Sequence, residues 1–226
     1  MALAVAGTDG LETTGADSYT ASAGSDRVVI VVTRLASATP LTSLRFGNSG
    51  PFMTQFGSAA VFTNGASSIT HQVWYLLEAD IIGGAQALTP NTGFATYCAW
   101  TLTDADQVTP IRTRLSQGAQ GSPRSLTFTA AQSLIGDVLL SCASSSGGVL
   151  LPNPAPAAFS METNSTAATR VGRFSVVTDG QTVTYTPGDS GANHLTTLDV
   201  VAINGGGVPA PTDRKRTTRR RLRLAA

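Results

Sequence analysis

The chain has 226 residues, of which 42% are hydrophobic and only 13% charged, with 23 glycines and a single lysine. This composition argues against a coiled coil or helical bundle, which needs runs rich in Ala, Glu, Lys and Leu. It also argues against global disorder, because a chain this apolar with a net charge of +1 lies outside the disordered class. The length suits one large all-β domain with a substantial core.

The small net charge hides an asymmetry along the chain. Residues 1–212 contain 8 arginines, no lysine and 13 acidic residues, whereas residues 213–226 contain 6 arginines, 1 lysine and 1 acidic residue. The net charge is therefore −5 for the first part and +6 for the second. A mildly acidic body that carries a cationic end is typical of an interaction tail.

Residues 1–16 show no clear period and are interrupted by Gly7, Gly10 and Gly15, so we expect an N-terminal arm or loop there. The opening residues lack the basic stretch and the long apolar run of a signal peptide. No stretch approaches the ~20 apolar residues of a membrane span, so we expect no membrane partner.

Residues 17–204 read as one β-sandwich domain of short strands separated by turn residues. We expect strands at 19–23, 27–35, 41–46, 52–56, 69–77, 93–103, 125–129, 138–143, 168–177, 182–186 and 195–203. This spacing is typical of sandwiches and barrels, and neither a long helix nor a long-period repeat is evident. The sequence therefore predicts an all-β, antiparallel, jelly-roll-like sandwich of about ten strands.

Several local patterns refine this prediction. The run 93–103 places Cys98, Trp100 and Leu102 on one face, and Asp179-Gly180 between two alternating runs is a strong hairpin signal. Segments 41–46 and 52–56 are expected to pair as a hairpin. Cys98 and Cys142 both sit in apolar runs, so we expect buried free thiols and synthesis in a reducing cytoplasm.

Residues 205–226 read as a Gly/Pro linker followed by an Arg-rich tail. The tail contains the candidate binding residues Arg214, Lys215, Arg216, Arg219, Arg220, Arg221, Leu222, Arg223 and Leu224. Arginine presents a planar fork that suits carboxylate and phosphate, and the alternating leucines would allow the tail to add as a strand to a neighbour's sheet edge. Docking on an acidic protein surface is favoured, while phosphate contacts to nucleic acid and a passive solubilising end stay open.

The sequence contains weak signals for chemistry. Gly188-Asp189-Ser190-Gly191 matches the tetrapeptide around a serine-protease nucleophile, but His71 lies in an apolar strand and His194 lies too close in sequence to serve Ser190. A turn is the favoured interpretation, and a hydrolase stays a minor alternative. Two histidines and two separated cysteines make a zinc site improbable, so we expect no metal or cofactor.

Exposed aromatic residues offer a further alternative, because such side chains stack on sugars. Trp100 aligns with apolar partners and is expected in the core. Trp74 and Tyr75 are adjacent and must point to opposite faces of their strand, so one of them is a candidate for a receptor- or carbohydrate-binding surface.

A set of short motifs gives the chain a resemblance. Asp26-Arg27 begins an apolar strand, Val73-Trp-Tyr-Leu-Leu77 forms another, Asp106-Gln-Val-Thr-Pro-Ile111 follows, and Gly136-Asp137-Val-Leu-Leu recurs in the second half. Together they resemble the β-sandwich module of phage virion structural proteins, which also occurs in bacterial surface proteins. The match covers about residues 17–204, and it departs where a glycine pair is lengthened at 47–51.

The resemblance implies a non-enzymatic structural or adhesive role. We expect a virion protein made in the host cytoplasm, of the capsid decoration or head-fibre type. Its partners would be the major capsid protein or other virion subunits, in a homo-oligomer. The shared motifs are structural, so whatever is specific to this chain is expected to reside in its arms and tail.

Overall fold

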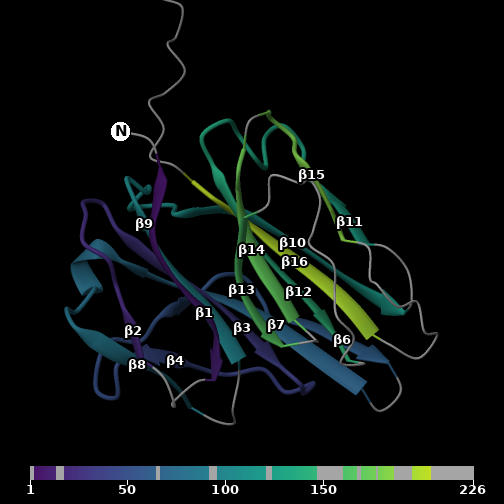
Figure 1. The fold of residues 1–226 in the computed structure, drawn as a ribbon, viewed down its shortest axis with the longest axis horizontal. Coiled ribbons are helices and arrows are strands. Elements are labelled where there is room, and N and C mark those ends of the chain that lie inside the picture. The colour runs from purple at the N-terminus through teal and green to yellow at the C-terminus, as the bar shows by residue number, and fades with distance from the viewer. Residues whose placement is uncertain are drawn as a thin grey trace, which may run out of the picture.

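The longest apolar runs of the chain form the middle strands of two sheets. The structure is a computed structural model that describes residues 3–13, 18–64, 67–91, 96–120, 124–146, 160–166, 169–176, 178–185 and 195–204. Its strands are all paired antiparallel, and the two largest sheets pack face to face (Figure 1). The predicted all-β antiparallel sandwich is confirmed.

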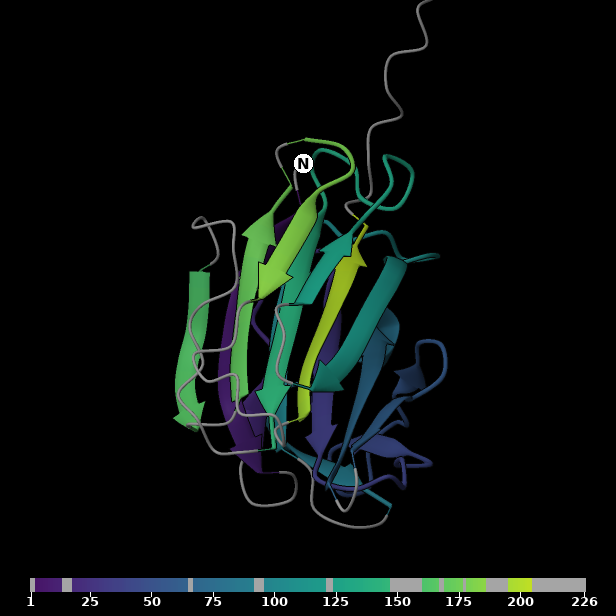
Figure 2. The same cartoon turned by 90° about the vertical axis from the view of Figure 1, so that its right-hand side faces the viewer.

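The first sheet has the strand order β1-β9-β3-β7, with β5 and β6 both pairing with β7. Its strands are β1 (Ala4–Thr13), β3 (Val28–Leu35), β5 (Thr54–Gln55), β6 (Ala60–Asn64), β7 (Ser67–Leu77) and β9 (Thr96–Thr103). The second sheet has the order β10-β16-β12-β14-β13, and Figure 2 shows its strands side by side. Its strands are β10 (Ile111–Gln120), β12 (Val138–Ser145), β13 (Ser160–Thr166), β14 (Thr169–Ser175) and β16 (Leu195–Ile203).

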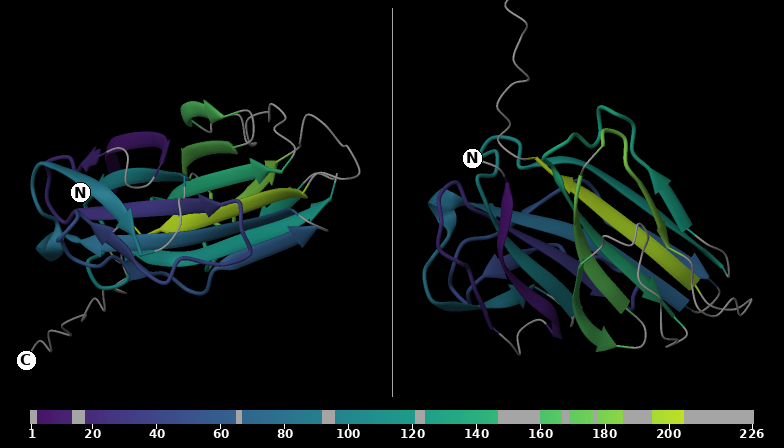
Figure 3. Two further views of the ribbon diagram at one scale, coloured as in Figure 1. Left: turned by 90° about the horizontal axis from the view of Figure 1, so that it is seen from below. Right: turned by 45° about the horizontal axis from the view of Figure 1, so that its top comes forward.

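Two smaller sheets cover the outer faces of the sandwich (Figure 3). The first is formed by β2 (Ser18–Thr20), β8 (Ala85–Pro90) and β4 (Leu44–Phe46), and the second by β11 (Arg124–Thr127) and β15 (Thr182–Tyr185). A short 3-10 helix, η1 (Glu78–Asp80), follows β7. Because both central sheets are buried on both faces, β3 and β12 are buried along almost their whole length and show no alternation of buried and exposed residues.

The pairing pattern shows that the molecule consists of two equivalent halves. In the first half β3 pairs with β7 and β9, β1 pairs with β9, and β2 pairs with β8. In the second half β12 pairs with β14 and β16, β10 pairs with β16, and β11 pairs with β15. Strands β1–β9 and β10–β16 therefore repeat one topology, with β4 and β5 as additions to the first half.

A shared irregularity confirms this equivalence. The β1–β9 ladder shifts register between Val5 and Gly7, and the β10–β16 ladder shifts between Ile111 and Thr113. Val5 pairs with Leu102, and Ile111 pairs with Ile203. Leu102 and Ile203 are equivalent positions, because they pair with the first residues of the equivalent strands β3 and β12.

The halves pack as two copies related by an approximate two-fold axis. The edge strand β1 lies against β13, and its equivalent β10 lies against β6, the equivalent of β13 (Figures 1 and 3). The sequence shows no long-period repeat, yet the structure repeats one strand topology in its two halves. The jelly-roll likeness extends only to the two-layer sandwich, because each central sheet comes from one contiguous half of the chain.

Other differences from the sequence prediction involve edge strands and turns. The described part has 16 strands instead of about ten, and the expected N-terminal arm contributes β1, whose glycines fit a strand that bends at its bulge. Asp179-Gly180 is a turn, with Gly180 at a φ of 76°, but the strands on either side pair with different partners. The expected pairing of 41–46 with 52–56 reduces to one bridge, between Arg45 and Phe52.

The contact between β10 and β6 gives a testable prediction. A Cβ added at Gly118 on β10 would overlap the ring of Phe62 on β6, whereas a Cβ at Gly83 would meet no atom. We expect Gly118→Ala to lower the free energy of unfolding by about 1–3 kcal/mol, as overpacked sites do. Gly83→Ala should leave it unchanged, and equal urea midpoints for the two variants would contradict the assigned contact.

Candidate functional site at the end of the sandwich that carries the tail

The nine predicted binding residues lie beyond Asn204 and therefore outside the described residues. The structure does define where the tail leaves the body. Asn204 follows β16 directly and lies beside the loop 104–110 that joins the two halves. The N-terminal end of β1 lies at this same end of the sandwich (Figure 1).

Asn204 is held to the body through both its backbone and its side chain. Its amide donates to the carbonyl of Pro110 at 2.8 Å, and its own carbonyl accepts from the amide of Asp106 at 3.1 Å. Its side-chain oxygen accepts from Arg112 Nη2 at 2.6 Å, and its side-chain nitrogen donates to the carbonyl of Thr109 at 3.2 Å. Arg112 is itself paired with Asp137 on the second half. The tail therefore begins from a fixed point that joins both halves.

Two of the motifs noted in the sequence, Asp26-Arg27 and 106–111, meet Glu78 at this end. Arg27, ahead of β3, makes a two-oxygen contact with Glu78, with Nε to Oε2 at 2.7 Å and Nη2 to Oε1 at 2.6 Å. Gln107 donates to the carbonyl of Arg27 at 3.1 Å and accepts from the amide of Glu78 at 3.1 Å. The hydrogen bond from Arg27 lowers the pKa of the Glu78 carboxyl below its usual range. We call these three residues the Arg27 cluster.

Carboxylates dominate the loops around the Arg27 cluster. Asp26 and Asp104 both have positive φ values, 47° and 57°, which aspartate tolerates better than most residues. The side chain of Asp106 accepts from the amides of Val108 and Thr109 at 2.8 Å each, and these bonds lower its pKa below the usual range. We call Asp26, Glu78, Asp80, Asp104 and Asp106 the acidic end, and Arg27 is its one arginine among the described residues of these loops.

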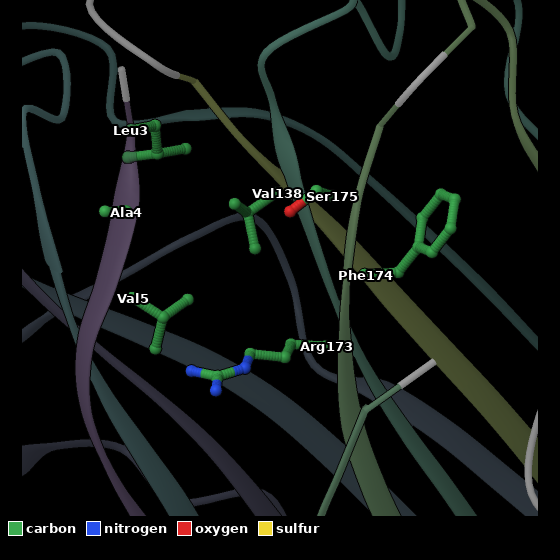
Figure 4. A pocket seen from close by; sticks show the side chains of 7 residues that line it. All are labelled: Leu3, Ala4, Val5, Val138, Arg173, Phe174 and Ser175. Carbon is green, nitrogen blue, oxygen red and sulfur yellow. The ribbon is translucent and has the colours of Figure 1, made fainter. Parts of the chain in front are cut away.

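Two pockets flank this end at positions related by the two-fold axis. The tyrosine pocket, of about 130 Å³, is lined by Phe56, Tyr75, Val108, Thr109, Pro110 and Ile111. The arginine pocket, of about 370 Å³, is lined by Leu3, Ala4, Val5, Val138, Arg173, Phe174 and Ser175 (Figure 4). Ile111 is equivalent to Val5, and Tyr75 on β7 is equivalent to Arg173 on β14.

The two pockets differ because of the added segment in the first half. Phe56 follows β5, and its amide donates to the carbonyl of Val73 at 2.8 Å, which places its ring in the tyrosine pocket. In the described part of the second half, no strand corresponds to β5. Figure 4 shows the guanidinium of Arg173 directed toward Val5, across the arginine pocket. One pocket is therefore small and aromatic, and the other is wider and carries a positive charge.

The interior between the sheets is polar at the opposite end. Arg114 on β10 pairs with Asp199 on β16, with Nε to Oδ1 at 2.9 Å, and both side chains are almost completely buried. Burial raises the pKa of the Asp199 carboxyl, and the paired guanidinium of Arg114 opposes that rise. His71 on β7 contacts Ser144 Oγ at 3.1 Å and Thr197 Oγ1 at 3.3 Å. We call these five residues the buried polar cluster.

Arg114 also closes a gap in the edge of the first sheet. Residues 56–59 separate β5 from β6, so β7 lacks a paired strand over part of its length there. Arg114 donates to the carbonyl of His71 at 2.9 Å and to the carbonyl of Ser58 at 2.8 Å. Its guanidinium therefore replaces missing backbone donors and joins the two sheets.

The order of Ser144, His71 and Asp199 is that of a hydrolase triad, but the geometry does not form one. His71 Nδ1 lies 3.7 Å from Asp199 Oδ2, which is too long for a hydrogen bond. The carboxylate is instead paired with Arg114, and His71 and Ser144 expose no surface that could meet a substrate. Burial and the nearby Arg114 and Arg34 lower the pKa of His71 to about 3, which keeps the ring neutral. The arrangement is a structural junction.

The remaining sequence predictions have different outcomes. Cys98 and Cys142 are buried free thiols and Trp100 lies in the core, as expected. Trp74 is only 2% exposed and donates to Thr33 Oγ1 at 3.3 Å, so it offers no stacking surface. Ser190 and His194 lie outside the described residues.

Neither a metal site nor a membrane-spanning helix is found in the described part of the chain. No group of three or more His, Cys, Asp or Glu side chains there is arranged to hold a metal ion. None of the described residues forms a helix long and apolar enough to cross a membrane.

Comparison with known proteins gives no relative for this chain: no protein-family model, curated protein or solved structure matches it.

The Arg114–Asp199 pair predicts a large loss of stability when one partner is neutralised. Asp199→Asn leaves the buried guanidinium of Arg114 without its counter-charge, so we expect the free energy of unfolding to fall by about 3–5 kcal/mol. Glu78→Gln breaks the more exposed Arg27–Glu78 pair and should cost about 1 kcal/mol or less. Urea unfolding at pH 7 measures both, and similar losses would contradict the junction role of Arg114.

The lowered pKa of His71 predicts acid sensitivity. His71 takes up a proton near pH 6.5 in the unfolded chain but only near pH 3 in the folded protein. The contribution of His71 to the free energy of unfolding is therefore fully present above pH 6.5 and is lost as the pH falls toward 3. At pH 5 we expect a loss of about 2 kcal/mol relative to pH 7, measured by urea unfolding. His71→Gln should remove this part of the pH dependence, and an unchanged slope would show that other groups cause it.

Proposed function

We propose that this chain is a non-enzymatic structural protein of a phage virion, of the capsid decoration or head-fibre type. The observation that carries the proposal is the Arg27 cluster. Three segments that resemble phage β-sandwich modules, around Arg27, Glu78 and Gln107, meet there in one hydrogen-bonded unit. The resemblance therefore rests on residues that build one end of the sandwich, which favours a structural role.

The body suits a load-bearing module. Both central sheets are covered on both faces, so apolar cores lie in three layers across the molecule. Buried charged and polar contacts join the sheets at one end. At the other end Asn204 binds the loop 104–110 that connects the two halves. An antiparallel body of this kind holds its shape while its terminal segment binds.

The tail supplies the anchor in this proposal. The segment with seven cations between Arg214 and Arg223 follows Asn204, which is fixed to the body next to the acidic end. We propose that they bind the capsid shell or neighbouring subunits through carboxylates. Binding of the same tail to genome phosphates would instead make attachment strongly dependent on salt.

A receptor- or carbohydrate-binding module of a tail fibre or bacterial surface protein is the second candidate. The tyrosine pocket favours it, because Tyr75 and Phe56 bring two aromatic rings to one small hollow. In that case Tyr75→Ala would abolish sugar binding and the tail would be dispensable. Trp74→Phe serves as the control, since Trp74 is buried and should not affect binding.

The anchor role gives a direct prediction for particles. A chain truncated after Val208 should fold with an unchanged circular-dichroism spectrum and melting curve, yet fail to bind particles that lack the protein. Immunogold labelling of the heads gives the occupancy, and a full-length variant with the seven tail cations changed to Gln controls for the length of the tail. Full occupancy by the truncated chain would overturn the proposed anchor.

A further inference from the structure

We propose that the Arg-rich tail of one copy docks in the tyrosine pocket of a neighbouring copy of this chain. The inference rests on the proposed anchor role and names the partner of the tail. One of the two leucines, Leu222 or Leu224, would enter the pocket, while the flanking arginines would pair with the acidic end.

The shape and chemistry of the pocket fit an aliphatic side chain. Phe56, Tyr75, Pro110 and Ile111 give it apolar walls, and Val108 at its rim is 86% exposed. Exposed apolar surface of this kind next to a formed hollow favours contact with a partner. In an extended tail, Leu222 and Leu224 point to one side and Arg221 and Arg223 to the other. Over residues 221–224 one face of an extended tail is therefore apolar and the other cationic.

Charge distinguishes the two equivalent pockets. The arginine pocket is lined by the guanidinium of Arg173 at the position where the tyrosine pocket has the ring of Tyr75. The tyrosine pocket has Asp106 directly at its rim, since this carboxylate accepts from the amides of Val108 and Thr109. The other carboxylates of the acidic end lie on the adjoining loops, which Arg27 and Gln107 connect. Only the tyrosine pocket offers apolar contact and charge complementarity together.

The position of the tail indicates that its partner is another copy. Asn204 hydrogen-bonds to Pro110, a residue of the tyrosine pocket, so the tail begins at the rim of its own pocket. Pro209 and Pro211 favour an extended chain, which carries the cations away from that rim. Each chain then has one tail and one acceptor pocket, which is a head-to-tail contact that closes into a ring when the rotation permits.

Disulfide trapping between two variants that each carry one added cysteine tests the contact in full-length protein. Val108→Cys and Leu224→Cys are made separately and mixed under oxidising conditions, so a cross-link between them joins two molecules. The native thiols do not interfere, because Cys98 and Cys142 are buried and burial raises the pKa of Cys142 to about 12. Ile135→Cys is the matched control, because Ile135 is 68% exposed and lies in the second half.

We expect the Val108→Cys and Leu224→Cys proteins to form a cross-linked pair at least ten times faster than Ile135→Cys and Leu224→Cys, with the linked peptides identified by mass spectrometry. Equal rates would overturn the proposal. A double variant that cross-links only within one molecule would overturn it as well, since the tail would then occupy its own pocket. Because particles are absent, failure here leaves the truncation result on particles unaffected.

A charge series tests the acidic end. Asp26→Asn, Asp104→Asn and Asp106→Asn remove three negative charges, and asparagine tolerates positive φ and can accept the same backbone bonds. In sedimentation velocity we expect the combined variant to self-associate at least tenfold more weakly than the unmodified protein. Asp179→Asn, a turn carboxylate of the second half, should change nothing. Loss of association by Asp179→Asn alone, or none with the combined variant, contradicts the docking site.

Discussion

The Arg114–Asp199 pair is the interaction on which the joining of the two central sheets depends. Asp199 lies in the middle of the second sheet and Arg114 on its edge, yet the guanidinium also reaches carbonyls of the first sheet at His71 and Ser58. Removing two charges from water is costly, and the cost is offset only when nearly every donor and acceptor finds a partner. Here the guanidinium meets that requirement through two carbonyls at the interruption of the first sheet, and so joins β10 to β7 and to the segment before β6.

The central strands were predictable from sequence because their apolar runs leave few alternatives. The strands that the sequence did not predict contain charged residues or glycines, which are typical of loops. Strand β10 carries arginines that point inward to buried carboxylates, and β1 contains glycines that its bulge requires. Strand β6 had a usable signal in the sequence, because the dipeptide Asn64-Gly65, which is common in hairpin turns, stands at its end just ahead of β7.

The internal duplication escaped detection because equivalent positions hold different chemistry. Trp100 corresponds to Val201, Cys98 to Asp199 and His71 to Thr169, so only the pattern of burial is shared. The candidate site was predictable only in part for a similar reason. The tail stands out in the sequence by its charge. Its proposed acceptor is built from Phe56, Tyr75 and Pro110, which lie far apart in the chain and come together only when β5, β7 and the loop before β10 meet.

The approximate two-fold relation between the halves has a consequence for assembly. A true dimer of identical halves would have two identical ends of chain and two identical pockets, so it would look the same after a half-turn. Here the halves are joined in one chain, β16 leads into the tail, and among the residues that the structure describes the pocket of the second half has no counterpart of Phe56. The molecule therefore has a direction, and units with a direction can be added to a growing array in one sense only.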